Sequence, residues 1–420
     1  MRFTDVAIVG GGLSGLYAAF LLQQQGVRCV VFEARARPGG RVLSVGVDSL
    51  RGGPADAADG PLQPDGGHPA ASPPATPGPS PRYDLGATWF WPELQPQLAQ
   101  LVQDLQLSAF AQPVAGHWLL ERSRHHRPER VPGYTPSPPS MRLAGGMATL
   151  VEALARPLGA ESVLTGHTVQ ALTLQPGGVH LEVLGAGLTQ TWHAQHVLLA
   201  LPPRLAATAL RFNPALPPAL YRAWQHTPTW MAPHAKYLAV FDRPFWREAG
   251  LAGAAQSTVG PMGEVHDAGS PPAGPGGPND HGGPAALFGF IGWPATARAQ
   301  MGRAALMEAC RAQLVRLFGP AAAQPQAEAL HDWALEAHTA TAQDQVAGGH
   351  ATAPPAGVAE GPWAGRLWGA GSEWSPEFPG YLAGAVEAAG RAVQALLRQP
   401  TGAIPGARRG GEDARPLADA

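Results

Sequence analysis

The 420-residue chain has few residues of several chemically useful kinds. Lysine occurs once, at Lys236, although the chain has 29 basic residues. The two cysteines, Cys29 and Cys310, lie far apart in apolar stretches, which supports neither a disulfide framework nor a cysteine metal site. The 15 histidines show no metal-binding spacing, so no metal site is predicted. No apolar stretch reaches the ~18 residues that a membrane span requires.

Charge is also sparse and nearly balanced. The formal net charge of −2 gives no reason to expect a nucleic-acid partner or an acidic membrane surface. An apolar strand begins almost at the first residue, which leaves no room for a signal peptide. We therefore predict a cytoplasmic protein with no nucleic-acid partner and no membrane attachment, and the length suggests two domains.

Glycine and proline are abundant, at 53 and 45 residues, but they are concentrated in a few segments. Residues 46–82 contain too few large apolar side chains to bury a core, so we predict a mobile low-complexity insertion. Residues 260–284 have a similar composition and predict a long loop between strands. Residues 401–420 are polar and predict a disordered tail.

The first 41 residues carry the most informative pattern. Residues 5–9 form an apolar run that predicts a buried parallel strand. Gly10, Gly12 and Gly15 follow in a G-x-G-x-x-G pattern, which permits a tight turn and a close approach of the backbone to a pyrophosphate. The predicted helix over residues 14–25 would point its first amides at the phosphates. Glu33 ends a second apolar strand, where it can accept a ribose hydroxyl, so the segment predicts a dinucleotide site.

Residues 33–41, Glu-Ala-Arg-Ala-Arg-Pro-Gly-Gly-Arg, sharpen this prediction. They resemble the E-x-R-x-R-x-G-G-R segment of flavin-containing amine oxidases. The resemblance implies that the dinucleotide is FAD, with Gly39, Gly40 and the second arginine, Arg37, covering its pyrophosphate. A guanidinium fork is well suited to an anion that helix amides do not fully satisfy.

Further segments resemble the same family. Residues 83–89, Tyr-Asp-Leu-Gly-Ala-Thr-Trp, resemble a segment that runs beside the isoalloxazine ring, and residues 142–147 resemble the glycine pair that opens the return into the FAD domain. Residues 167–169 are a weaker match, to a strand whose valine backbone meets the adenine. Residues 365–373 and 378–390 resemble the family's second signature, which implies a helix from about Gly380 with its positive end at the flavin. The cofactor-binding residues that these matches imply are Gly10, Gly12, Leu13, Ser14, Gly15, Glu33, Ala34, Arg35, Gly39, Gly40, Arg41, Gly86, Ala87, Thr88, Val169, Gly371, Ser372, Glu373, Tyr381 and Leu382.

Lys236 and Tyr381 are the predicted catalytic residues. Lys236 lies in a strand that resembles the family's K-x-x-x-x-x-x-x-P-F-W segment, where the lysine holds a water against flavin N5. Every other Lys or Arg position of the chain is arginine, yet this position is lysine. An ammonium can hold one water and can lose its proton when it is desolvated. The alternative is an exposed strand lysine with its stem laid over apolar surface.

Tyr381 matches a family tyrosine that faces the flavin, where two parallel aromatics guide an amine. The second aromatic is absent, because Ala351 stands at its position. His350 stands where some members have a flavin-linking cysteine, so the FAD is predicted to be non-covalent. A polar loop residue without a function is an equal interpretation of His350.

The order of apolar segments predicts an α/β fold, with a Rossmann-like FAD-binding domain and an interleaved α+β substrate domain. We assign residues 1–88, 141–232 and 340–400 to the first and residues 89–140 and 233–339 to the second. Other predicted helices cover residues 94–107, 147–158, 303–318 and 381–398. Other predicted strands cover residues 163–164, 168–174, 179–184, 191–193, 197–201, 236–241 and 286–291.

The resemblance implies oxidation of an amine to an imine, with O2 or another acceptor taking the electrons. Two alternatives stay open. One is an enzyme that desaturates carbon–carbon bonds, like porphyrinogen-oxidising relatives, which the missing aromatic favours. The other is a non-catalytic FAD-binding protein, which Lys236 and Tyr381 argue against.

Overall fold

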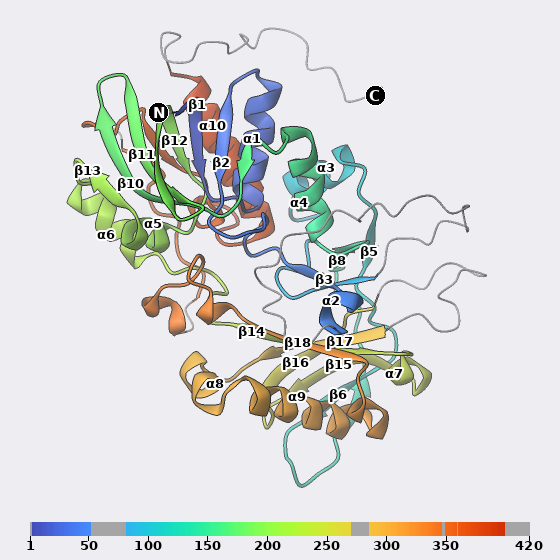
Figure 1. Cartoon of the computed structure of the whole chain (residues 1–420). Coiled ribbons are helices and arrows are strands. Elements are labelled where there is room, and N and C mark those ends of the chain that lie inside the picture. Colours follow the sequence, from blue (N-terminus) through green and yellow to red (C-terminus); the bar gives the residue numbers. More distant parts are fainter. Residues whose placement is uncertain (1, 52–80, 270–284, 347–348, 359, 400–420) are drawn as a thin grey trace, which may run out of the picture.

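The computed structural model describes residues 2–51, 81–269, 285–346, 349–358 and 360–399, and it places two β-sheets in separate halves of the molecule (Figure 1). The first sheet has the strand order β13-β10-β11-β12-β1-β2-β9, with β19 also paired to β12. Its strands are β1 Arg2–Val9, β2 Cys29–Phe32, β9 Val163–Leu164, β10 His167–Gln175, β11 Gly178–Gly185, β12 Leu188–Leu199, β13 Arg211–Asn213 and β19 Leu367–Gly369.

The centre of this sheet is parallel and buried on both faces. β1 pairs in parallel with β12 and β2, and β2 pairs in parallel with β9. Ile8 packs into one core and Val9 into another on the opposite face, which is why residues 6–9 of β1 are all apolar. Four helices supply the first core, and two others contribute to the second. They are α1 Leu13–Gln24, α3 Pro96–Asp104, α4 Ala148–Ala155 and α10 Leu382–Leu397 on one face, and α5 Pro203–Ala209 and α6 Pro218–His226 on the other. Ala388 of α10 also packs into the second core.

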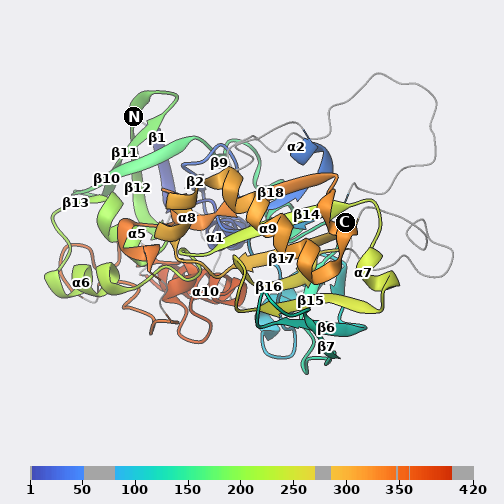
Figure 2. The ribbon, with the colours of Figure 1, turned by 90° about the horizontal axis from the view of Figure 1, so that it is seen from below.

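The second sheet has the order β18-β14-β17-β16-β15-β6-β7. Its strands are β6 His117–Glu121, β7 Glu129–Pro132, β14 Ala235–Phe241, β15 Leu251–Ser257, β16 Met262–Asp267, β17 Ala285–Ile291 and β18 Ala327–Asp332. Helix α9, Arg303–Phe318, covers one face and packs Leu306 and Leu314 against Tyr237 (Figure 2). The opposite face packs Leu238 and Phe288 against the two-stranded sheet of β3, Ser44–Gly46, and β4, Arg82–Asp84, so this small sheet joins the two halves.

The remaining elements are short connections. They are α2 Val47–Arg51, β5 Ala109–Ala111, β8 Met141–Leu143, α7 Phe245–Glu248, α8 Ala295–Met301, η1 Arg156–Leu158, η2 Pro320–Ala323, η3 Trp333–Leu335, η4 Ala342–Gln345 and η5 Ser372–Trp374. In the described part of the chain, no helix combines the length and apolarity needed to cross a membrane.

The fold class is as predicted, and the helix over residues 303–318 has its predicted bounds. Three local predictions are wrong. Residues 191–193 and 197–201 are not two strands, because β12 runs unbroken from Leu188 to Leu199 beside β11 and β1. The loop predicted from residue 260 contains β16, which pairs with β15 and β17 despite its flanking glycines and prolines. The insertion predicted over residues 46–82 is too long, because residues 46–51 belong to β3 and α2 and residue 82 begins β4. Residues 52–80 of that insertion, residues 270–284 of the predicted loop and the tail at 401–420 lie outside the described residues, and the domain boundaries stay predictions.

Candidate active site

A cavity of about 1120 Å³ lies between the two halves. One end is walled by the loop between β1 and α1, the end of β2, the chain after β4, and the N-terminus of α10. The other end is walled by β14, β16, β17 and the segments before α8 and after β18. Residues widely separated in sequence thus meet around one space.

Glycines shape the first end of the cavity. Gly10 has a φ of +109°, and a Cβ there would lie 2.6 Å from the Ala200 carbonyl oxygen. A Cβ at Gly15 would lie 1.9 Å from the Gly10 carbonyl oxygen, so α1 can pack on the loop only without a side chain at this position. Gly12 provides no side-chain cap for α1, which leaves amides at the start of this 12-residue helix to meet an anion in the cavity.

Glu33 is buried beside this loop. Its Oε2 accepts from the Gly11 amide at 2.7 Å, and its Oε1 accepts from the Arg35 amide at 3.0 Å. Arg35 in turn donates to Glu336 at 2.9 Å and to Thr339 at 2.7 Å. These bonds fix the end of β2 against the segment after β18, with Glu33 and Arg35 on the cavity wall.

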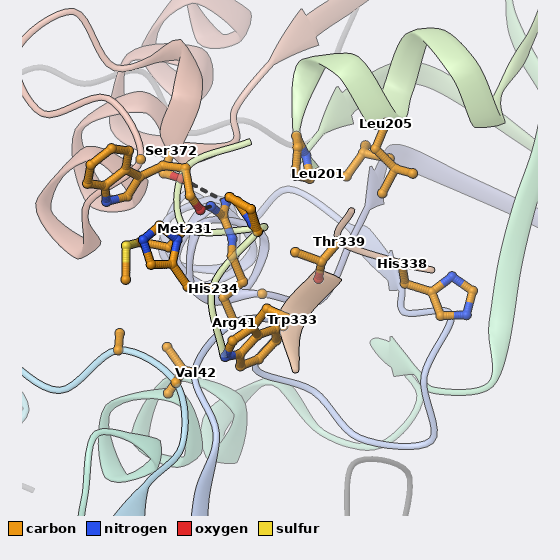
Figure 3. A pocket seen from close by; sticks show the side chains of 18 of the residues that line it. Arg41, Val42, Leu201, Leu205, Met231, His234, Trp333, His338, Thr339 and Ser372 are labelled. Atoms are coloured by element: carbon orange, nitrogen blue, oxygen red, sulfur yellow. Dashed lines mark hydrogen bonds between the residues drawn. The ribbon is translucent and has the colours of Figure 1, made fainter. Parts of the chain in front are cut away.

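Arg41 makes a second junction. Its guanidinium donates to both carboxylate oxygens of Glu373, at 2.6 and 3.0 Å. The same guanidinium donates to Ser372 Oγ at 3.0 Å (Figure 3). It also donates to the Trp230 carbonyl at 3.2 Å. Arg41 lines the cavity, whereas Glu373 is 3 % exposed and lies behind it, so Glu373 holds Arg41 in place. A direct contact between Glu373 and a cofactor stays a prediction.

Arg37 takes a different position from the one that the resemblance implies. Its guanidinium donates to the carbonyls of Val42 and Gly40, each at 3.2 Å. The side chain is buried within its own loop and is not part of the cavity wall. Arg37 therefore stabilises the turn that presents Gly39 and Gly40.

A second helix N-terminus opens on the cavity beside Arg41. Gly380, with a φ of +85°, turns the chain into α10, and Tyr381 at its N-cap makes no side-chain cap bond. Tyr381 and Leu382 line the cavity. Together with α1, this gives the cavity two positive helix ends, which suit an anion or a ring that gains negative charge.

Lys236 projects from β14 into the middle of the cavity wall. Its Nζ donates to Thr88 Oγ1 at 2.6 Å and to the Gly86 carbonyl at 3.2 Å, and lies 4.0 Å from the centre of the Phe288 ring. Complete burial lowers the pKa of Lys236 to about 7, with the Asp84 charge opposing this shift. The ammonium can therefore give up or regain its proton near neutral pH.

The environment of Tyr381 departs from the two-tyrosine pattern. Ala351 supplies no ring, and the ring that lies parallel to Tyr381 is the exposed imidazole of His350, at 4.7 Å and 14°. His350 also stacks on Trp230 at 3.5 Å. Trp91 meets Tyr381 edge-on at 6.4 Å. His350 is thus the middle ring of a stack beside the cavity and not an isolated loop residue.

Most residues predicted from the sequence meet on one wall. Three predicted residues do not line it: Gly15, which lies inside the α1 packing, Arg37, which is buried within its own loop, and Glu373, which lies behind Arg41. Sequence reasoning missed Trp91, Trp230 and Glu264, which do line it. The aromatic run before Trp91 was a usable signal, whereas Glu264 lay in a segment predicted to be a loop.

The wall fits FAD on its own features. A pyrophosphate needs close backbone, helix amides and a fixed guanidinium, and Gly12, the start of α1 and Arg41 provide these. Glu33 and Val169 lie at the end of the cavity where a ribose and adenine would be held. The two cysteines are elsewhere, since neither Cys29 nor Cys310 lines the cavity.

Comparison with known proteins decides the family. The model of the family "Flavin containing amine oxidoreductase" matches residues 117–397, and that of the NAD(P)-binding Rossmann-like domain matches residues 8–58. The chain belongs to the flavin-containing amine oxidoreductase family. The predicted family and fold class are therefore confirmed.

The individual relatives share only about a third of their aligned residues with this chain. The chain is similar to an L-amino acid dehydrogenase of Synechocystis sp., with 29 % identity over 62 % of this chain and 52 % of that protein. It is also similar to the putative flavin-containing monoamine oxidase AofH of Mycobacterium tuberculosis, with 31 % identity over 61 % and 53 %. The chain thus spans about half the length of the curated relatives it matches.

Solved structures show the same fold. Wild-type putrescine oxidase bound to putrescine superimposes with a TM-score of 0.68 over 94 % of this chain and 99 % of that one, at 20 % identity. Cyclohexylamine oxidase from Brevibacterium oxydans gives the same TM-score and identity over 94 % and 98 %. At this identity, the likeness establishes the fold alone.

Proposed function

We propose that this protein holds FAD non-covalently and oxidises an amine to an imine. When bound, FAD supplies a flavin that can accept a hydride equivalent. The substrate loses this hydride from the carbon next to nitrogen and a proton from the nitrogen. O2 then takes up the two electrons with two protons and leaves as hydrogen peroxide.

The position of Lys236 is the single observation that carries this proposal. The one lysine of the chain reaches Thr88 and the Gly86 carbonyl, beside the small residues predicted to run along the flavin ring. A Cβ at Gly86 would lie 2.0 Å from the Arg41 carbonyl oxygen, so the backbone here is as close as it can be to the cofactor loop. An ammonium with a pKa of about 7 at this place can hold a water and move a proton.

The other residues either position the substrate or exclude water from it. Tyr381 presents a ring to the cavity and is held by His350 and Trp91. Trp89, Trp91 and Phe290 line the substrate end and exclude water from the reacting carbon. The start of α10 stabilises negative charge that develops on the flavin.

The carbon–carbon desaturase remains a second candidate for one reason. Ala351 leaves Tyr381 without a second tyrosine, and the pair is the feature that would guide an amine nitrogen. The charged groups at the substrate end, Lys236 and Glu264, favour the amine, since a polyene or a porphyrinogen core would gain little from them.

Anaerobic addition of donors to the yellow purified protein tests the proposal. Amines should bleach the flavin absorption band, and subsequent admission of O2 should restore it with release of hydrogen peroxide. Bleaching by polyene or porphyrinogen donors and not by amines would replace the proposal with the desaturase. Bleaching by no donor would indicate a non-catalytic flavoprotein.

A further inference from the structure

The proposed reaction requires an acceptor for the proton that leaves the substrate nitrogen. An alkyl amine in neutral solution is protonated, like a lysine side chain. Only the deprotonated nitrogen has the lone pair that forms the C=N bond as hydride leaves the neighbouring carbon. A neutral base on the cavity wall near Lys236, with an open lone pair, can accept this proton from the bound substrate.

Most titratable groups that line the described part of the cavity are unsuited to accept it. Lys236 already donates to two oxygens of the chain after β4. Glu33 accepts from two backbone amides at the cofactor end, and the His167 amide donates to its carbonyl there. Glu264 lies on β16, two strands away from Lys236 on β14. His338 lies on the far side of the cavity from the remaining candidate, His234 (Figure 3).

His234 lines the cavity two residues before Lys236. Ala235 begins β14 and pairs with Asp332, and the His234 carbonyl accepts from the Trp333 amide at 3.0 Å, so His234 continues the pairing of this strand. Alternate residues of a strand point to the same face of a sheet. His234 and Lys236 thus face the cavity from the same strand, about 7 Å apart at the backbone.

The two ring nitrogens of His234 have different surroundings. Nδ1 is enclosed and has no hydrogen-bond partner. Nε2 is accessible from the cavity, and among the described residues it makes no hydrogen bond. With its proton on Nδ1, the neutral ring therefore presents the lone pair of Nε2 to a ligand in the cavity.

The charges around His234 favour the neutral ring. Burial is the main cause that lowers the pKa of His234 below its ordinary value of 6.5, and the charge of Arg298 on α8 lowers it further. The Met231 carbonyl opposes this shift, although it forms no hydrogen bond with Nδ1. Arg298 is paired with Asp332 on β18 at 2.6 Å, and Lys236 is the titratable neighbour on β14. His234 is therefore unprotonated at neutral pH and can accept a proton.

The same surroundings act on a bound substrate. Desolvation lowers the pKa of Lys236 to about 7, and it acts in the same direction on an ammonium group bound beside Lys236. Repulsion between the two cations adds to this effect. The difference in pKa between the bound substrate and His234 is thereby reduced, which makes transfer of the proton easier.

We propose that His234 is a further catalytic residue, whose Nε2 accepts a proton from the substrate nitrogen before hydride leaves the neighbouring carbon. The N–H bond breaks and its electron pair stays on nitrogen, where it then forms the C=N bond while the C–H electron pair leaves as hydride. The proton passes from Nε2 to water after the product has left. This inference rests on the proposed amine oxidation and adds the base that it requires.

The test measures anaerobic reduction of the FAD-loaded protein by an unbranched primary amine at a series of pH values. Ionisation of the amine in solution changes the apparent Kd, whereas the limiting rate at saturating amine reports steps after binding. The limiting rate of the wild type should fall as the pH drops below about 6.5, because His234 then becomes protonated. H234Q should lower the limiting rate by roughly 100-fold at neutral pH and should remove this fall.

Three further variants serve as controls. H226Q changes an exposed histidine of α6 that does not line the cavity, and it should keep the rate and pH profile of the wild type. K236M should keep the fall in rate at acid pH, which separates His234 from Lys236. H234A leaves space for a small base, so added imidazole should restore part of its limiting rate and leave the wild type unchanged. This rescue, measured with FAD bound, cannot come from a folding defect.

The outcomes separate this inference from the proposed function. Equal limiting rates and pH profiles in the wild type and H234Q would overturn the role of His234 and leave amine oxidation standing. Failure of imidazole to accelerate FAD-loaded H234A would also overturn it, as would loss of the acid fall in K236M and not in H234Q. Reduction of the wild-type flavin by no amine would overturn the proposed function itself.

Discussion

The two ends of the cavity are built on different principles. The cofactor end is made of backbone, small residues and guanidinium–carboxylate pairs whose bonds are already complete, such as Arg41 with Glu373. The substrate end is made of aromatic side chains with two charges, Lys236 and Glu264, that retain room for a ligand. A fixed end suits a resident cofactor of constant shape, and an end with available charges suits a substrate that arrives and leaves.

The largest effect should come from breaking the fixed end. R41A removes one partner of a pair whose carboxylate is buried, which should lower the free energy of unfolding by about 3–5 kcal/mol. FAD should be lost as well, because Arg41 also ties the cofactor loop to Ser372 and Trp230. The ratio of flavin to protein absorbance and the melting temperature measure both effects.

An exposed pair provides the matched control for this variant. Arg122 and Glu129 pair at 2.9 Å, with side chains 71 % and 58 % exposed. R122A should therefore cost at most about 1 kcal/mol and leave FAD bound. Equal losses in the two variants would show that the junction at Arg41 is not special.

A smaller effect should come from filling the glycine loop. G15A places a methyl group 1.9 Å from the Gly10 carbonyl oxygen, which should lower the free energy of unfolding by roughly 1–3 kcal/mol and weaken FAD binding. Gly390 in α10 has no atom within 4 Å of a new Cβ, so G390A should raise stability by about 0.5–1 kcal/mol. Chemical denaturation compares the two, and a stabilising G15A would contradict the close packing.

The third effect concerns the substrate end and depends on pH. The pKa of Lys236 falls from 10.5 to about 7 on folding, so between these values the unfolded chain holds a proton that the folded chain lacks. The free energy of unfolding should rise with pH across this window, by at most about 1.4 kcal/mol per pH unit. Below pH 7 the buried ammonium of Lys236 should lower the free energy of unfolding by its full amount. Urea unfolding of wild type and K236M from pH 7 to 10.5 checks this. The difference in free energy of unfolding between the two proteins should shrink as pH rises. A difference that stays constant with pH would refute the lowered pKa of Lys236.

The two ends also differed in how far the sequence predicted them. Gly10, Gly12, Glu33 and the start of α10 were predictable because a turn, a strand end and a helix start depend on neighbouring residues. Glu264 was not, since it reaches the cavity only through the pairing of β16 with β17, and its glycine- and proline-rich surroundings indicated a loop. His350 was predicted as an ambiguous residue for the same reason, because its stack depends on rings at Trp230 and Tyr381 that are distant in sequence.

The position of Glu373 could not be fully predicted from the sequence, for a different reason. The motif around it placed it near the cofactor, and the structure puts it in the same region but behind Arg41. Which member of an ion pair faces a ligand depends on side-chain directions that spacing does not encode.

The proposed function requires the cavity to bring the C–H bond next to an amine nitrogen to the flavin. Its most direct test is single-turnover anaerobic reduction of the FAD-loaded protein by a primary amine, unlabelled or deuterated at that carbon. Deuterium should slow the bleaching of the flavin band at saturating amine. Equal rates for the two amines, or no bleaching by either, would contradict it.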